Sequence, residues 1–230
     1  MSSYDAFAPI YDDWSAQMTE DVPFYVELAG ETEGPLVELA VGTGRVAIEV
    51  ARGTGRPVLG IDNSPAMLAL ARERADAAGA QLELREGDMR ELELDEPAGL
   101  IYCPGRSLLH LPTWPDRRGV FERVHASLRP GGLFAWNAFV FDPRIAVRID
   151  GEWQEQNGIR HRIDQFKHDN RVDITLESGS TISLWWLNRS EWEGLIEVGG
   201  FEVEALYGDF DRKPFDESAT EFVWVVRKPL

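Results

Sequence analysis

The sequence predicts an α/β protein built on a doubly wound, mostly parallel sheet, with an antiparallel final strand pair and a small antiparallel β insertion. Two observations carry this prediction. Between residues 36 and 141, short apolar segments alternate with segments of helical periodicity, which is typical of a parallel sheet covered by helices on both faces. After residue 142 this alternation stops, and segments of alternating apolar and polar residues follow, as in antiparallel strands.

Residues 4–30 are predicted to be helical. Aromatic residues recur there at intervals of about three to four, which places them on one apolar helix face. Pro9 and Pro23 are expected to interrupt this helical segment. We expect residues 1–34 to form an N-terminal helical cap. The aromatic residues of this cap are Tyr4, Phe7, Tyr11, Trp14, Phe24 and Tyr25.

The next segment, residues 35–142, is predicted to contain the parallel strands and their crossover helices. Its helix at 64–79 has the clearest signals, because Ser64 can cap the start, Pro65 suits the first turn and Gly79 can end it. Right-handed crossovers place such strands parallel to one another. The strands are expected at 36–41, 57–62, 82–88, 98–104 and 133–141, and the helices at 45–54, 64–79 and 115–132.

Residues 143–188 are expected to form the antiparallel β insertion, with three strands inside 162–188 separated by short polar turns. Residues 189–230 are expected to complete the main sheet with a helix at 190–201 and two final strands. An exposed strand edge can pair with a second copy of the chain. The insertion is therefore either a lid over a site or a contact in a homodimer, and both alternatives stay open.

Composition restricts the partners of this chain. It has 40 acidic and 23 basic residues and a net charge of -17. A surface this acidic repels phosphate backbones and anionic lipid, so we expect neither nucleic acid nor a membrane as a partner. One cysteine, Cys103, excludes an internal disulfide and a cysteine-built metal site. No signal peptide or membrane-spanning run is recognisable, so a cytoplasmic location is expected.

A glycine turn follows the first predicted strand, in the segment LVELAVGTGRVAIEVA (36–51). Gly42 and Gly44, with Thr43 between them, let the backbone approach a ligand closely, and the following helix offers unpaired N–H groups. Counting Ala47, the stretch fits G-x-G-x-x-A, a pattern shared by dinucleotide-binding proteins. The turn alone predicts a site for a carboxylate, a phosphate or a ribose.

Acidic residues mark three consecutive predicted strands. Glu38 lies within the first strand, and Asp62 and Asp88 end the second and the third. Because the carboxyl ends of parallel strands open onto one crevice, these acids are expected at one site. Asp62 can bond the hydroxyls of a ribose, although it can also simply cap the next helix. Three acids suit a ligand with a cationic portion better than a pyrophosphate.

Four motifs in order resemble those of class I S-adenosylmethionine-dependent methyltransferases that act on small molecules. They are VELAVGTGR, GIDNSPAML, LREGDM and LRPGGLF, and they cover residues 36–141. YDAFAPIYD near the N-terminus and the last two strands resemble the first helix and the final strand pair of this family. The linked motifs are more specific than the glycine turn alone. The resemblance implies a Rossmann-like, cofactor-binding core over residues 35–142.

The resemblance also implies S-adenosylmethionine as the cofactor and assigns residues to its parts. Glu38 would lie near the amino end of the methionine portion, and Asp62 would hold the ribose hydroxyls. Asp88 would accept a hydrogen bond from the adenine amino group, and Tyr11 would close over the site. Many members have glycine where this chain has Ala40. The further residues implied in cofactor binding are Ala40, Gly42, Thr43, Gly44, Asn63, Met67, Gly87, Met89 and Cys103.

The methyl acceptor is expected beside the ends of the fourth and fifth strands. His110 is the candidate catalytic residue: it could act as a base, orient the acceptor, or only pack in a helical turn. Arg106 could grip an acceptor carboxylate or remain an exposed cation. Of the neighbours Trp185 and Trp186, one is expected in a core and the other half-exposed or in a pocket. The residues expected to bind the acceptor are Trp14, Arg106, Trp136, Asn137 and Phe139.

The sequence therefore predicts an enzyme that moves a methyl group from S-adenosylmethionine to nitrogen or oxygen of a small-molecule acceptor by in-line displacement. No metal is expected, since no histidine has the spacing of a metal site. Two alternatives stay open: an oxidoreductase that uses a nicotinamide dinucleotide, and a non-catalytic module that binds S-adenosylmethionine. The strand-end acids disfavour the first, and turnover would exclude the second.

Overall fold

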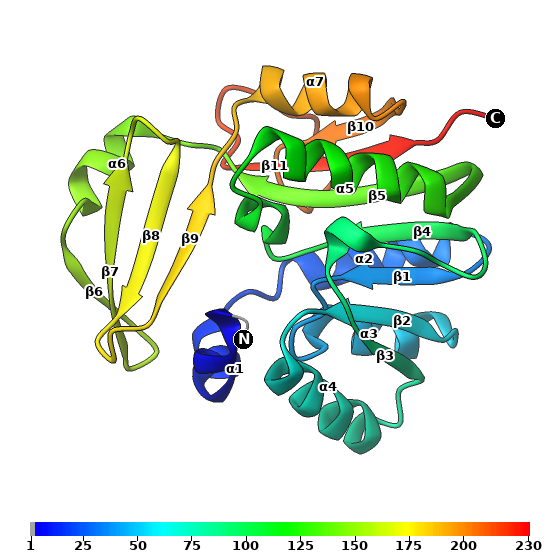
Figure 1. Ribbon diagram of the computed structural model, residues 1–230, viewed down its shortest axis with the longest axis horizontal. Helices are drawn as coiled ribbons and strands as arrows, with labels where there is room; N and C mark the ends of the chain where they lie inside the picture. The colour runs from blue at the N-terminus through cyan, green and yellow to red at the C-terminus, as the bar shows by residue number, and fades with distance from the viewer. Residues whose placement is uncertain (1–2) are drawn as a thin grey trace.

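The largest feature of the computed structural model, which describes residues 3–230, is a seven-stranded sheet (Figure 1). Its strands run in the order β10-β11-β5-β4-β1-β2-β3, and β1 to β5 pair in parallel. β11 pairs antiparallel with β5 and with β10, which confirms the predicted fold class. The strands are β1 (Leu36–Leu39), β2 (Val58–Asp62), β3 (Leu82–Glu86), β4 (Ala98–Cys103), β5 (Leu128–Phe139), β10 (Glu202–Tyr207) and β11 (Glu221–Arg227).

Helices cover both faces of this sheet. α2 and α3 pack with one group of core side chains, and α5 and α7 pack with the other. Along β1, Val37 and Leu39 belong to the α5 side and Leu36 to the α2 side, so the strand is buried on both faces. The helices are α2 (Asp21–Gly30), α3 (Arg45–Thr54), α4 (Pro65–Ala78), α5 (Trp114–Ser127) and α7 (Arg189–Val198).

The start and end of α4 confirm the predicted helix signals. Ser64 accepts a hydrogen bond from the backbone N–H of Met67 at 3.2 Å, and Pro65 is the first helical residue. Gly79 ends the helix with a φ of 63°, in the left-handed region that glycine adopts without strain. The capped start of α4 fixes the short connection from β2, where Asp62 and Asn63 lie.

The helix predicted over 115–132 is shorter in the structure, because α5 ends at Ser127 and β5 begins at Leu128. Pro130 cannot continue a helix, and Gly131 has a φ of 74°. Leu128 already pairs with Ala98 of β4, and the register then shifts before Leu133 pairs with Leu100. The Pro-Gly-Gly segment is therefore an irregular beginning of a strand rather than the end of a helix.

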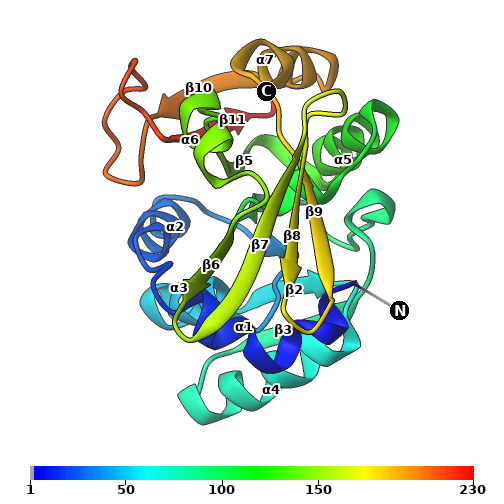
Figure 2. The same ribbon diagram turned by 90° about the vertical axis from the view of Figure 1, so that its left-hand side faces the viewer.

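A separate four-stranded antiparallel sheet, in the order β6-β7-β8-β9, follows β5 and confirms the predicted β insertion (Figures 1 and 2). The prediction lacked β6 and the helix α6 (Pro143–Ile149). α6 has an N-cap signal in the sequence, since Asp142 accepts a hydrogen bond from the Arg144 N–H at 2.8 Å. The small sheet consists of β6 (Trp153–Gln156), β7 (Ile159–Phe166), β8 (Arg171–Leu176) and β9 (Thr181–Trp185).

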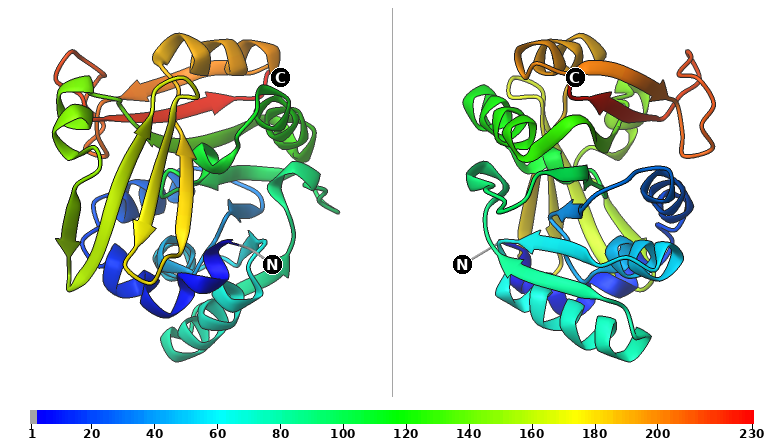
Figure 3. Two further views of the ribbon diagram at one scale, coloured as in Figure 1. Left: turned by 60° about the vertical axis from the view of Figure 1, so that its left-hand side comes forward. Right: turned by 90° about the vertical axis from the view of Figure 1, so that its right-hand side faces the viewer.

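The N-terminal elements η1 (Ser3–Ala6) and α1 (Ala8–Ser15) lie between the small sheet and α4 (Figures 2 and 3). Phe7 packs with Met67 of α4 and with Ile182 of β9 in one buried cluster. Pro9 and Pro23 do not interrupt a helix, because each lies in the first turn of its own helix, where no intrahelical bond is lost.

Met1 and Ser2, the start of the predicted N-terminal cap, lie outside the described residues. The division of the chain into 1–34, 35–142, 143–188 and 189–230 stays a prediction. The same holds for the choice between a lid and a homodimer contact for the insertion.

Candidate active site

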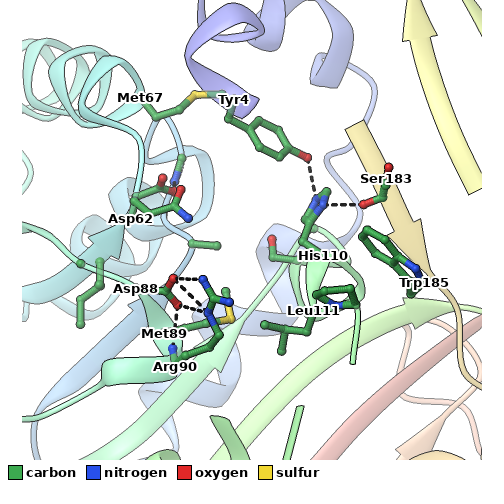
Figure 4. A pocket seen from close by; sticks show the side chains of 18 of the residues that line it. Tyr4, Asp62, Met67, Asp88, Met89, Arg90, His110, Leu111, Ser183 and Trp185 are labelled. Atoms are coloured by element: carbon green, nitrogen blue, oxygen red, sulfur yellow. Dashed lines mark hydrogen bonds and ion pairs between the residues drawn. The ribbon is translucent and has the colours of Figure 1, made fainter. Parts of the chain in front are cut away.

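A cavity of about 360 Å³ lies where β1 to β4 end, between the large sheet and a covering wall made by η1, α1, η3 (Ser107–His110) and β9 (Figure 4). It brings together most of the predicted cofactor residues and His110. The large-sheet wall consists of Ala40, Gly42, Ile61, Asp62, Asn63, Met67, Gly87, Asp88, Met89 and Arg90. The covering wall consists of Tyr4, Tyr11, Gly105, Ser107, His110, Leu111, Pro112, Thr181, Ser183 and Trp185.

The glycine turn is held by Asp62. Its Oδ2 accepts a hydrogen bond from the Gly42 N–H at 2.8 Å, and its Oδ1 accepts one from the Ser64 N–H at 2.9 Å. Ala40, Gly42 and Gly44 all have left-handed backbone angles, with φ of 54°, 55° and 79°. Burial raises the pKa of Asp62, and the backbone N–H groups oppose that rise. Asp62 therefore braces the turn and also faces the cavity.

Asp88 carries an ion pair with Arg90, a residue that the sequence prediction did not include. Arg90 Nη2 lies 2.5 Å from Asp88 Oδ2, and Arg90 Nε donates to both carboxylate oxygens at 3.0 Å. Hydrogen bonding to Arg90 lowers the pKa of Asp88, so the carboxyl group is ionised at neutral pH. A ligand at this end of the cavity meets a carboxylate and a guanidinium side by side (Figure 4).

In the covering wall, Tyr4, His110 and Ser183 are joined by hydrogen bonds (Figure 4). The Tyr4 hydroxyl lies 2.8 Å from His110 Nε2, and His110 Nδ1 lies 3.0 Å from the Ser183 carbonyl oxygen. Burial lowers the pKa of His110 to about 4, so the imidazole is neutral at pH 7. Burial raises the pKa of Tyr4 and of Tyr11, so both phenols are also neutral.

Other predicted cofactor residues lie behind the cavity surface. Glu38 is buried, and its carboxyl group lies beside Tyr102 of the neighbouring strand β4. Burial raises the pKa of Glu38 well above its usual range. Thr43 donates a hydrogen bond to Asp12 of α1 at 2.7 Å, which ties the cap to the glycine turn. Gly44 and the buried Cys103 do not line the cavity.

Residues 36–132 match a family described as "Methyltransferase domain". This segment, less than half of the chain, is similar to a methyltransferase domain. A curated relative, the carboxy-S-adenosyl-L-methionine synthase of Chromohalobacter salexigens, is 34% identical over 113 residues, which are 48% of this chain and 38% of the relative. The chain thus matches well under half of that relative's length.

Solved structures share the fold of this chain beyond the matched segment. The CcbJ methyltransferase of Streptomyces caelestis has a TM-score of 0.84 at 24% identity, over 100% of this chain and 99% of that one. An S-adenosylmethionine-dependent methyltransferase of Clostridium acetobutylicum has 0.81 at 16% identity over 100% of both chains. The sugar N-methyltransferase KedS8 of a Streptoalloteichus species has 0.69 at 16% identity, over 95% of this chain and 92% of that one.

Beside the first cavity lies a second one, of about 320 Å³, which is lined by two predicted acceptor residues, Arg106 and Asn137. Arg106 pairs with the buried carboxylate of Glu221, and Asn137 donates a hydrogen bond to Glu221 at 3.2 Å. Arg106 has a left-handed φ of 63°. Gly105 lines the first cavity, so the two cavities adjoin at the loop after β4.

The other predicted acceptor residues line neither cavity. Trp136 is fully buried in the core and packs against Trp192 and Trp224, with ring centroids at 5.6 and 6.1 Å. Trp14 stacks on Phe7, with ring centroids at 5.5 Å, in the cluster that joins the cap to the small sheet. Phe139 lies under the guanidinium of Arg106 at 5.6 Å.

The sequence analysis missed Tyr4, Thr181 and Ser183 of the covering wall, and it offered a pocket as one alternative for Trp185 or Trp186. Thr181, Ser183 and Trp185 occupy alternate positions of β9, so one face of this strand meets the cavity. The alternation of residues along β9 was visible in the sequence. The sequence did not show which face of this strand meets the large sheet. Trp186, the neighbour of Trp185, instead stacks on Phe141 at 4.1 Å.

Residues 3–230 contain neither a metal-binding cluster nor a membrane-spanning helix. No group of histidine, cysteine or acidic side chains in this range could hold a metal ion. Helices that are both long and apolar enough to cross a membrane are also lacking from the same range.

Proposed function

We propose that this protein transfers the methyl group of S-adenosylmethionine to an amine nitrogen of a small organic acceptor. One observation carries the proposal: in a single cavity, carboxylates at the ends of β2 and β3 face a wall of neutral tyrosine and histidine side chains. The carboxylate side suits the methyl donor, and the neutral side suits an acceptor that needs no strong base.

The large-sheet wall fits S-adenosylmethionine. The two oxygens of Asp62 each hold one backbone N–H and keep lone pairs for ribose hydroxyls. Glu38, buried behind this wall beside Tyr102, is assigned to the ammonium group of the methionine portion. Asp88 is assigned to the adenine amino group, with Met67 and Met89 beside the ring.

S-adenosylmethionine, when bound, supplies a methyl group that its sulfonium already activates. The protein has to hold the acceptor in line and to exclude water, because orientation supplies most of the rate. An amine that arrives neutral needs no base, whereas a hydroxyl acceptor has to lose a proton. His110 is a weak base, since its pKa is about 4 and its Nε2 contacts Tyr4. This supports a nitrogen rather than an oxygen acceptor.

The covering wall supports a small acceptor. The rings of Tyr11 and Trp185 offer apolar and π surface, which also attracts a cation. Arg106 and Asn137, in the adjoining cavity, are assigned to a polar part of the acceptor. The likeness to KedS8, a sugar N-methyltransferase, is consistent with an amine acceptor of this kind.

Cofactor binding is tested by calorimetry with S-adenosylmethionine. Asp62→Ala removes a carboxylate that holds the glycine turn and faces the cavity, so we expect the Kd to rise about 10- to 100-fold. Asp95→Ala, at an exposed acid outside the cavity, is the matched control and should keep the wild-type Kd. Binding of a nicotinamide dinucleotide in place of S-adenosylmethionine would favour the oxidoreductase alternative and refute the proposal.

Activity is tested by S-adenosylhomocysteine formation with a panel of amino sugars and other small amines, each compared with the alcohol of matching structure. We expect turnover with amines and none with the alcohols. Equal rates for both sets would contradict the choice of nitrogen. Tight cofactor binding without product from any acceptor would identify the non-catalytic alternative.

A further inference from the structure

The covering wall contains a chain of two hydrogen bonds that joins three distant segments. Tyr4 of η1 contacts His110 Nε2 of η3 at 2.8 Å, and His110 Nδ1 contacts the backbone carbonyl of Ser183 in β9 at 3.0 Å (Figure 4). The rings of Tyr4 and His110 meet edge-on at 89°, with centroids 5.1 Å apart. All three residues line the cavity.

The chemistry of these groups decides the direction of both hydrogen bonds. A carbonyl oxygen can only accept, so His110 Nδ1 carries a hydrogen and donates it to Ser183. A neutral imidazole has one N–H, which leaves Nε2 with a lone pair. The Tyr4 hydroxyl therefore donates to Nε2, and its hydrogen is directed at His110. The burial that keeps His110 neutral agrees with this tautomer.

This arrangement changes the role open to His110. Its basic nitrogen is already engaged by the hydrogen of Tyr4, so the imidazole does not meet an acceptor as a free base. Because the Tyr4 hydrogen is committed to His110, the phenolic oxygen can act only as an acceptor toward a polar group of a ligand in the cavity. A neutral amine has an N–H that can donate to that oxygen.

We propose that Tyr4 contacts the methyl acceptor by accepting a hydrogen bond from its amine N–H, and that His110 and the Ser183 carbonyl act only through Tyr4, as positioning groups. This inference rests on the proposed amine acceptor. In the reaction, the nitrogen lone pair forms the N–C bond as the C–S bond breaks and leaves its electrons on sulfur. The positive charge moves to nitrogen, and the product ammonium later gives a proton to water.

The transferred charge gives this contact a catalytic effect. The N–H···O bond to Tyr4 strengthens as the nitrogen becomes cationic, because charge-assisted hydrogen bonds are the stronger ones. An interaction that is stronger in the transition state than in the ground state raises kcat. No base is required at any point, which agrees with the neutral groups of the covering wall.

The same chain of hydrogen bonds explains what the small sheet contributes to the covering wall. Ser183 lies in β9, and its carbonyl selects the tautomer of His110. Its side chain donates a hydrogen bond to Asp173 of β8 at 2.7 Å, which fixes β9 at this point. The β insertion thus sets the orientation of a hydroxyl group on the N-terminal cap, more than 100 residues away in the sequence.

The test is a double-mutant cycle with Tyr4→Phe and His110→Leu, measured with an amine acceptor. Tyr4→Phe keeps the ring and removes the hydroxyl, so we expect kcat to fall about 10- to 100-fold. The Kd of the Tyr4→Phe variant for S-adenosylmethionine should change less than about twofold. The control variant Tyr207→Phe, at a tyrosine outside the cavity, should keep full activity. His110→Leu should lower kcat in the wild-type background and add nothing in the Tyr4→Phe background.

Two results would overturn the inference. The first is a His110→Leu effect of equal size in both backgrounds, which would mean that His110 acts on the acceptor directly. The second is a pH–kcat limb near 6.5 that the His110 substitution removes, since it would identify His110 as a base. His110→Gln, whose amide can both donate to Ser183 and accept from Tyr4, should retain more activity than His110→Leu.

Nitrogen NMR of labelled histidine separates this inference from the proposed function. We expect His110 to show the Nδ1–H tautomer from pH 8 to pH 5, with or without an acceptor. The opposite tautomer overturns the hydrogen-bond chain whatever the activity. If the wild-type protein methylates no amine while the tautomer is as expected, the proposed function is refuted. The role of Tyr4 in catalysis is then refuted as well.

Discussion

The two walls of the cavity are assembled in different ways. The large-sheet wall comes from the ends of β1, β2 and β3, which follow one another along the chain. The covering wall joins Tyr4 to His110 across 106 residues and His110 to Ser183 across 73. The first wall follows from local motifs and parallel topology. The second forms only when distant segments pack together.

The sheets behind these walls also differ. Every residue of β4 in the large sheet is buried, whereas β8 of the small sheet has two buried residues among six. A strand buried on both faces has little room to adjust, and a strand with one solvated face has more. The comparison predicts that changes in the buried central strands of the large sheet cost stability, whereas changes in the covering wall mainly cost activity.

Two tryptophans give the largest expected contrast. Trp136→Ala empties a fully buried site, so we expect the free energy of unfolding to fall by about 3–5 kcal/mol. Trp185→Ala changes a partly buried ring at the cavity, and we expect a loss of about 1 kcal/mol with a higher KM for the acceptor. Urea denaturation of both variants measures the difference. Similar losses in the two would contradict the comparison.

The burial of His110 in the covering wall connects stability to pH. Its pKa is lowered from 6.5 to about 4, so the unfolded chain takes up a proton at a higher pH than the folded one. Relative to His110→Gln, wild-type stability should be fully present above about pH 6.5 and fall towards pH 4, by up to about 3 kcal/mol.

Denaturation of both proteins from pH 8 to pH 4 measures this effect. The carboxylates titrate in both proteins, so the difference isolates His110. Tyr4, the titratable group in contact with His110, stays neutral throughout this range because burial raises its pKa. A difference that does not vary with pH would show that His110 is solvated like an exposed histidine.

The smallest expected effect lies at Ala40 in the large-sheet wall. Its φ of 54° is a conformation that costs alanine more than glycine. Ala40→Gly should raise the free energy of unfolding by about 0.5–1 kcal/mol and leave the Kd for S-adenosylmethionine nearly unchanged. Ala80→Gly, at a residue without a positive φ, is the control and should not stabilise the protein. Destabilisation by Ala40→Gly would refute this account of the turn.

The sequence signals that succeeded are local. The cap of α4 at Ser64, the turn at Gly42 and the acids at the ends of β2 and β3 lie where the pattern placed them. The signals that misled lacked tertiary information. Pro130 and the glycines after it read as a helix stop, but Leu128 and Leu133 on either side of them pair with β4. Trp136 read as a residue near the acceptor, but its side of β5 packs against α7.

By itself, the sequence determined the parallel core, the strand-end carboxylates and the resemblance to a methyltransferase. Hydrophobic periodicity and helix caps are properties of neighbouring residues, so they can be read along the chain. Only the tertiary structure decided which face of β9 meets the cavity and which tautomer His110 adopts. Those features depend on contacts between packed elements, and periodicity along one strand carries no information about the partner that lies across from it.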